Sequence, residues 1–225
     1  METAGTGNRI QNDGVPRQVK DITDSMVKLL VGEAPHIQTF HVHKTILTQS
    51  SRFFQNAVKP EWTKKEAPIR ILEDPQVLEP YIQWLYGNKP DLRSVHPPYV
   101  RLYLLGEFLQ DRVFQNFVLS GMIARIKLGY VFSIDMINYL YEGTVSRSPA
   151  RRLLVDAWCW LGSSRVLELN VENLPREFKD ELLVRVMYHR REPYLEGEFP
   201  WIAQPEMYRH VETSQPNESS SQQIT

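Results

Sequence analysis

Two apolar periodicities divide the chain, and the change from one to the other is the strongest constraint on its fold. Up to about residue 72, short apolar or alternating runs predict strands at MVKLLV (Met26–Val31), TFHVH (Thr39–His43) and PIRIL (Pro68–Leu72). Two short helices are expected between the second and third strands. From Pro75 onward a period of 3.6 residues prevails, so we predict an α+β unit followed by an all-helical one.

The helical part divides at capping residues and glycines. We expect helices over about 75–86, 99–110, 111–129, 133–143, 148–162 and 175–190, with Asp111 and Ser148 as N-caps and Gly162 just past a C-terminus. A short edge strand is also expected at Leu92–Val95, because prolines at 90, 97 and 98 limit its length.

Composition excludes few function classes, but it limits the expected partners and the cellular compartment. A net charge of -1 provides no global basic field for nucleic acid. The N-terminal residues lack the apolar region of a signal peptide, and no run approaches the roughly 20 apolar residues of a membrane span. We therefore expect an intracellular protein, in cytoplasm or nucleus, with no membrane contact. The single cysteine, Cys159, lies between two tryptophans and is predicted to be a buried, inert thiol.

The stretch FHVHKTILTQSSRFF (Phe40–Phe54) is the main candidate for chemistry. His41 and His43 share one face of a predicted strand and could hold a metal ion, but no third ligand follows at a recognisable spacing. The hydroxyl run that follows fits helix-cap positions better than a catalytic triad. No nucleotide-binding glycine motif occurs, so we expect no cofactor, no small-molecule substrate and no enzyme, and keep a metal-dependent enzyme as the alternative.

Two basic clusters are candidates for partner contacts. Arg147, Arg151 and Arg152 fall near the start of a predicted helix, where positive charge opposes the helix dipole, so contact with an acidic partner is one interpretation and a solvated face the other. The second cluster, Arg185, His189, Arg190 and Arg191, lies at a predicted helix C-terminus, where cations are favourable.

The order of these elements resembles the BTB/POZ domain, in the form common in short fungal proteins. The resemblance spans about Thr23 to Leu128 and depends on MVKLLVG, TFHVHKTIL, SSRFFQNAV and IRILEDPQVLEPYIQWLYGN. Its most specific part is an ordered series: Phe40, Val42, His43, Lys44, Leu47, Phe53, Phe54, Trp84, Leu85 and Tyr86. The later helices resemble the extension that follows this domain in many relatives.

This resemblance implies a small sheet capped by helices and a protein that works through protein contacts. The domains expected are a flexible tail at 1–22, the BTB/POZ domain at 23–128, a helical extension at 129–202 and a second tail at 203–225. The implied function is a non-catalytic interaction module that dimerises or docks partners. Alternatives are a substrate adaptor of a cullin-type ubiquitin ligase and a transcription-associated scaffold.

Two departures from the family pattern weaken those alternatives. The charged pocket of transcription-factor members would need an acid at Ser25 and an arginine at Ser50, and this chain has neither. Cullin-binding members often carry a hydrophobic-x-Glu element, which DLRSVHPPYV (Asp91–Val100) lacks. No DNA-reading motif follows, so no direct contact with nucleic acid is expected.

Overall fold

The computed structural model describes residues 25–59, 67–94 and 98–189. The described residues up to Tyr188 belong to one compact unit, and His189 is assigned to a second. Both predicted tails lie outside the described residues, as do Arg190 and Arg191. In the described part of the chain, no helix combines the length and apolar character needed to cross a bilayer.

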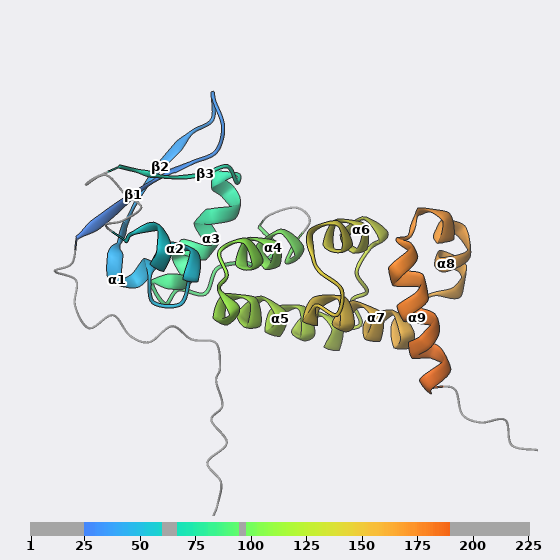
Figure 1. The fold of residues 1–225 in the computed structure, drawn as a ribbon. Coiled ribbons are helices and arrows are strands. Elements are labelled where there is room, and N and C mark those ends of the chain that lie inside the picture. Colours follow the sequence, from blue (N-terminus) through green and yellow to red (C-terminus); the bar gives the residue numbers. More distant parts are fainter. Residues whose placement is uncertain (1–24, 60–66, 95–97, 190–225) are drawn as a thin grey trace, which may run out of the picture. The chain divides into compact units, whose positions relative to one another are not determined.

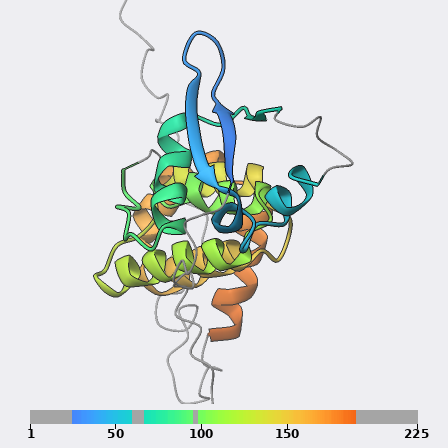
Figure 2. The ribbon, with the colours of Figure 1, turned by 90° about the vertical axis from the view of Figure 1, so that its left-hand side faces the viewer.

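The first elements build a small sheet with helices beside it, as Figures 1 and 2 show. In chain order they are β1 (Met26–Val31), β2 (Gln38–His43), α1 (Lys44–Leu47), α2 (Arg52–Ala57), β3 (Ile69–Ile71) and α3 (Pro75–Leu85). The remaining elements are α4 (Val100–Phe108), α5 (Arg112–Lys127), α6 (Ile134–Gly143), α7 (Pro149–Leu161), α8 (Ser164–Asn170), the 3₁₀ turn η1 (Val171–Asn173) and α9 (Arg176–His189). This arrangement confirms the α+β fold class.

The sheet has the strand order β2-β1-β3. The strands β1 and β2 form an antiparallel hairpin in which Leu29 pairs with Phe40, and β3 runs parallel to β1 on the other side. A parallel pair needs a crossover connection, and the segment that carries α1 and α2 supplies it. Gly32 begins the hairpin turn at a φ of 100°, and a Cβ there would lie 2.5 Å from the His36 carbonyl oxygen, so the turn requires glycine.

One hydrophobic cluster runs from the sheet to the last helix, from Leu29 to Leu182. The helix α4 packs against α3, α5 and α6, and α7 packs against α5 and α6. The largest side chains fully buried in this cluster are Trp84, Tyr81, Tyr103, Phe54, Phe114, Phe132 and Phe178. The helices after α5 therefore share a core with the sheet-bearing part.

The structure differs from the sequence predictions at three places. Residues 91–94 form a turn rather than the predicted strand Leu92–Val95, because the Asp91 carboxylate accepts from the backbone N–H and the guanidinium of Arg93; Val95 lies outside the described residues. The helix α8 was not predicted, since its seven residues show too short an apolar pattern. Cys159 is only partly buried against the core, not enclosed as predicted.

Candidate interaction surfaces

His43 occupies the junction between β2 and α1, and its partner is Tyr86 just past the end of α3. The Tyr86 hydroxyl accepts from the His43 backbone N–H at 3.2 Å and lies 2.7 Å from His43 Nδ1. Both contacts can form together when the hydroxyl proton points toward Nδ1. The next residue, Lys44, is exposed, and its backbone N–H donates to the Ser25 carbonyl oxygen at 2.9 Å. The imidazole of His43 therefore fastens a strand-to-helix turn to α3.

The proposed metal pair does not gain further ligands from the fold. His41 is exposed on β2 opposite Lys28, and one of the two ring nitrogens of His43, Nδ1, lies 2.7 Å from the Tyr86 hydroxyl. Among the residues that the structure describes, no three His, Cys, Asp or Glu side chains gather in a way that could hold a metal ion. The geometry gives no support to a metal-dependent reaction at His41 and His43.

Most of the other residues in the family-like series lie in the core. Val42, Leu47, Phe54, Trp84 and Leu85 are buried, while Phe40 and Phe53 are partly buried against the same cluster. These seven side chains therefore act through packing. Phe53 also contacts Phe108 of α4 at a ring-centroid distance of 5.0 Å, and Phe108 is 51% exposed. The two rings form an aromatic pair that reaches the surface.

Asp111 is a buried carboxylate that connects three segments. Its side chain accepts from the backbone N–H groups of Val113 and Phe114, as the predicted cap of α5. It also accepts from the Ser50 hydroxyl at 2.5 Å and from the Tyr81 hydroxyl at 2.9 Å. Burial, and then the Asp111 charge, raise the pKa of Tyr81 well above its ordinary value. Sequence reasoning identified the cap but missed both hydroxyl partners, which come from distant parts of the chain.

Neutral hydroxyls therefore occupy the surroundings of the Asp111 carboxylate. Ser50, where the resemblance noted in the sequence would place the arginine of charged-pocket members, donates its hydroxyl proton to Asp111. Ser51, next in sequence, caps α2 through the Phe54 N–H and donates to the Leu109 carbonyl oxygen at 2.7 Å. These contacts hold the α2 end against the α4–α5 turn and place Ser50 and Ser51 in structural roles.

The prediction that Arg151 contacts a partner is wrong, because the side chain is buried with only 3% exposure. Its guanidinium donates to Thr144 Oγ1 at 2.8 Å and to the Tyr141 carbonyl oxygen at 2.7 Å, and also bonds to the Thr144 carbonyl oxygen and to Glu177. The same group lies over the Tyr141 ring, 4.2 Å from its centroid. Arg151 therefore caps the C-terminal end of α6 and links it to α9.

Arg147 and Arg152 lie at the surface. Both side chains are exposed, and both line a hollow of about 610 Å³ beside α7 and α9. Arg185 lines the same hollow and pairs with Asp156 at 2.8 Å. Two members of the second predicted basic cluster are thus described: Arg185 forms an ion pair within the chain, and His189 is exposed.

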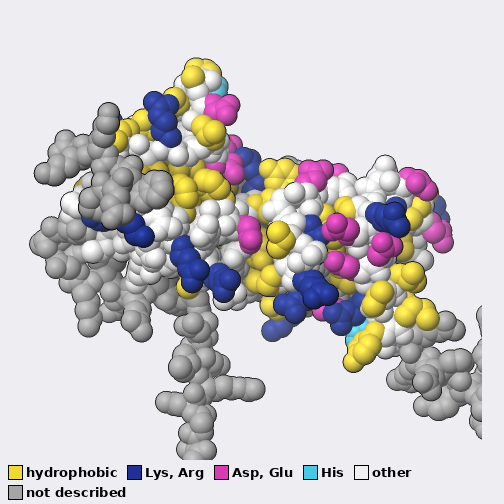
Figure 3. All heavy atoms as spheres, viewed as in Figure 1, with side chains coloured by type: hydrophobic (Ala, Val, Ile, Leu, Met, Phe, Trp, Pro, Cys, Tyr) yellow, Lys and Arg dark blue, Asp and Glu magenta, His cyan; other side chains and the backbone are white. Residues whose placement is uncertain are grey.

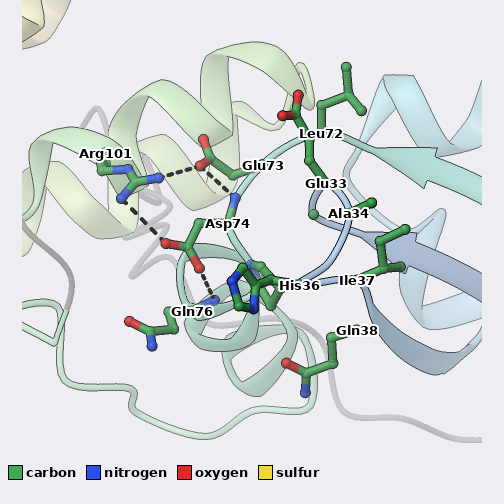
Figure 4. A pocket seen from close by; sticks show the side chains of 12 residues that line it. Glu33, Ala34, His36, Ile37, Gln38, Leu72, Glu73, Asp74, Gln76 and Arg101 are labelled. Carbon is green, nitrogen blue, oxygen red and sulfur yellow. Dashed lines mark hydrogen bonds and ion pairs between the residues drawn. The ribbon is translucent and has the colours of Figure 1, made fainter.

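A second hollow, of about 810 Å³, lies where the β1–β2 turn approaches the β3–α3 connection (Figure 4). Arg101 of α4 reaches into it and contacts Glu73 at 2.6 Å and Asp74 at 3.7 Å. Asp74 is at the same time the N-cap of α3, through Gln76. Arg101 offsets only one of the two carboxylates, so these three side chains carry a net charge of -1, which does not favour an anionic ligand.

The described part of the chain combines a three-stranded sheet with helices beside it, and its buried polar side chains, such as Asp111 and Arg151, serve structural roles. Comparison with known families shows what kind of domain this is, since residues 17–113 match the family model described as the BTB/POZ domain. The chain contains a BTB/POZ domain at these residues. BTB domains mediate protein–protein interactions and are not usually catalytic. No curated protein matches the chain.

Proposed function

We propose that this protein is a non-catalytic interaction module that self-associates or docks partner proteins through its BTB domain. The observation that carries the proposal is the BTB/POZ match over residues 17–113, which covers β1 through α4. Two polar side chains of this domain have structural contacts: His43 Nδ1 lies 2.7 Å from the Tyr86 hydroxyl, and the Asp111 carboxylate caps α5. We place the protein inside the cell, in cytoplasm or nucleus.

The surface that supports self-association best is the aromatic pair Phe53 and Phe108. Phe108 is 51% exposed, and the ring of Phe53 lies against it and against Phe54 of the core. An exposed aromatic backed by the core is a rigid apolar anchor, which is the kind of residue that dominates binding energy at protein interfaces. A second copy of the chain is the partner we favour for this pair.

Light scattering on size-fractionated protein over a range of concentrations tests the proposal. We expect a dimer, and we expect Phe108→Ser to shift it toward monomer. Leu169→Ser is the matched control, because Leu169 is also an exposed apolar residue, on α8, and lies outside the BTB match. A monomer at every concentration, which also captures no partner in a pull-down, would contradict the proposal.

A cullin adaptor is the second candidate function, and it rests on the BTB domain alone. The segment Asp91–Val100 has no glutamate to complete the element that cullin-binding members often carry. Titration of the full chain against a purified cullin N-terminal domain decides the matter, and absence of binding at micromolar protein removes this candidate. A transcription-associated scaffold ranks below it, since Ser25 and Ser50 stand where the charged pocket needs an acid and an arginine.

A further inference from the structure

We propose that a continuous groove along α5, the α6–α7 loop, α7 and α9 binds an extended acidic segment of a partner protein that carries interspersed apolar side chains. This surface lies mostly beyond the BTB match, which ends at residue 113. The proposal goes beyond self-association through the BTB domain and does not depend on it.

Three neighbouring hollows form the groove because they share lining residues. The first, of about 440 Å³, extends from Ser50 and Arg52 to the start of α5. The second, of about 400 Å³, shares Glu107 and Arg112 with the first and reaches the α6–α7 loop. Arg147 of that loop lines both the second hollow and the third, of about 610 Å³, between α7 and α9. A ligand can therefore pass from one hollow to the next without leaving the surface.

Exposed arginines line all three hollows of the groove. Arg52, Arg112, Arg147 and Arg152 line it and are exposed, and within the described ranges none of their guanidinium groups makes an ion pair or a hydrogen bond. Figure 3 shows two groups of Lys and Arg side chains along this side of the molecule, one near α2 and the start of α5 and one over α7, with apolar side chains among them. Four free guanidinium groups along one path favour carboxylates presented at intervals.

The acidic residues of the groove already have partners. Glu107 accepts from the Gln115 side-chain amide at 2.6 Å, and Glu181 accepts from the Tyr141 hydroxyl at 2.6 Å. Asp180 lies 3.7 Å from the Arg176 guanidinium. Glu107 and Glu181 keep their negative charge because their donors are neutral, so a bound segment must place its own carboxylates beside the arginines and away from these residues.

The floor and rim of the groove are apolar enough to require more than charge. Val113 and Leu119 of α5 are partly buried, and Val155 of α7 is buried at the base of the third hollow. Val145 and Val184 are 68% and 70% exposed beside them. Apolar side chains of a bound segment would cover these residues and gain the hydrophobic contribution that carboxylates alone cannot give.

A protein segment fits this surface better than a nucleic acid. Glu107, Asp180 and Glu181 also line the groove, and they would repel a phosphate at every nucleotide, whereas a peptide can place its carboxylates only beside the arginines. The chain as a whole carries a net charge of -1, so no wider field assists a polyanion.

Selection of displayed random-sequence peptides on the full-length chain tests the proposal, followed by titration of the synthesised winners. The test variant is Arg112→Gln/Arg147→Gln, which removes two charges where the hollows join. The control is Arg70→Gln/Arg165→Gln, which removes the same charge from exposed positions on β3 and α8. Thermal melts and light scattering on the same samples verify that both variants fold and separate this result from self-association.

We expect the enriched peptides to combine Asp or Glu with apolar residues. Their binding should be about five- to thirtyfold weaker to the groove variant, unchanged in the control variant, and weaker at higher salt. Enrichment of basic or neutral peptides, equal loss in the two variants, or no enrichment would overturn the proposal. Tighter binding of a single-stranded oligouridine probe than of any selected peptide would also overturn it, in favour of a nucleic-acid partner.

Discussion

Replacement of Arg151 is the sharpest test of how the helical part is held together. The sequence predicted this charged side chain at the surface, and the structure places it in the interior. Arg151→Ala should destabilise the folded protein far more than Arg152→Ala, although the two residues are neighbours on α7 and carry the same charge.

The expected magnitude follows from what each partner of Arg151 loses. The Tyr141 carbonyl oxygen is buried, and leaving it without a donor costs about 1–3 kcal/mol. Loss of the guanidinium from the Tyr141 ring adds roughly 0.5–2 kcal/mol. Glu177 contributes little, because its side chain is 65% exposed and water can replace the arginine. We therefore expect Arg151→Ala to lower the free energy of unfolding by about 3 kcal/mol.

Urea denaturation followed by circular dichroism measures this difference directly. Arg152→Ala should change the free energy of unfolding by less than about 0.5 kcal/mol, as is usual for an exposed residue. Arg151→Lys should recover only part of the loss, since an ammonium group cannot reach Thr144, Tyr141 and Glu177 in the planar fork that a guanidinium provides. A lysine variant as stable as the parent, or an alanine variant no worse than Arg152→Ala, would refute the reasoning.

Three other predictions concern the BTB-bearing part. Phe54→Ala should cost about 3–5 kcal/mol because it empties a fully buried position, whereas His41→Ala should stay within about 0.5 kcal/mol; equally severe losses in thermal melts would mean that the faces of β2 are misassigned. Asp111→Ala should lower the free energy of unfolding, measured by urea denaturation, by about 2–4 kcal/mol, since it removes the α5 cap and leaves the Tyr81 hydroxyl without its acceptor. A loss below about 1 kcal/mol would show that Asp111 does not hold these segments together. Because the folded state raises the pKa of Tyr81, its contribution to stability is present below the ordinary tyrosine pKa of 10 and falls as pH rises above it; urea midpoints measured across that range should decline less steeply in Tyr81→Phe, and an unchanged slope would count against this assignment.

Most helices and strands could be predicted from the sequence, because the residues that begin and end them lie within a few positions of each other. Ser148 at the N-cap, Pro149 at the first helical position and Gly162 beyond the end bound α7 as predicted. Asp111 caps α5 and Ser133 caps α6 for the same physical reason: a short polar side chain can accept from the first free N–H groups. The predicted strand at Leu92 failed because a side-chain contact within two residues, from Asp91 to Arg93, favours a turn there.

The candidate surfaces were less predictable, since they depend on residues far apart in the chain. The contact between Ser50 and Asp111 spans 61 positions, and no periodicity indicates it. The groove likewise joins Arg52 of α2 to Arg112, Arg147 and Arg152, which lie on different elements. Only tertiary packing brings these four guanidinium groups to one path.

The basic cluster at the start of α7 nevertheless contained a signal that separates its members. Leu154, Val155 and Trp158 form the buried stripe of this helix, and they follow Arg151 at intervals of three, four and seven residues. Arg151 therefore shares their face, whereas Arg152 is turned one position away and Arg147 precedes the helix. A charged residue that falls on an apolar stripe must find partners in the interior, and the free C-terminal carbonyls of α6 supply them. Arg147 and Arg152 have no such place on the stripe, and both are exposed.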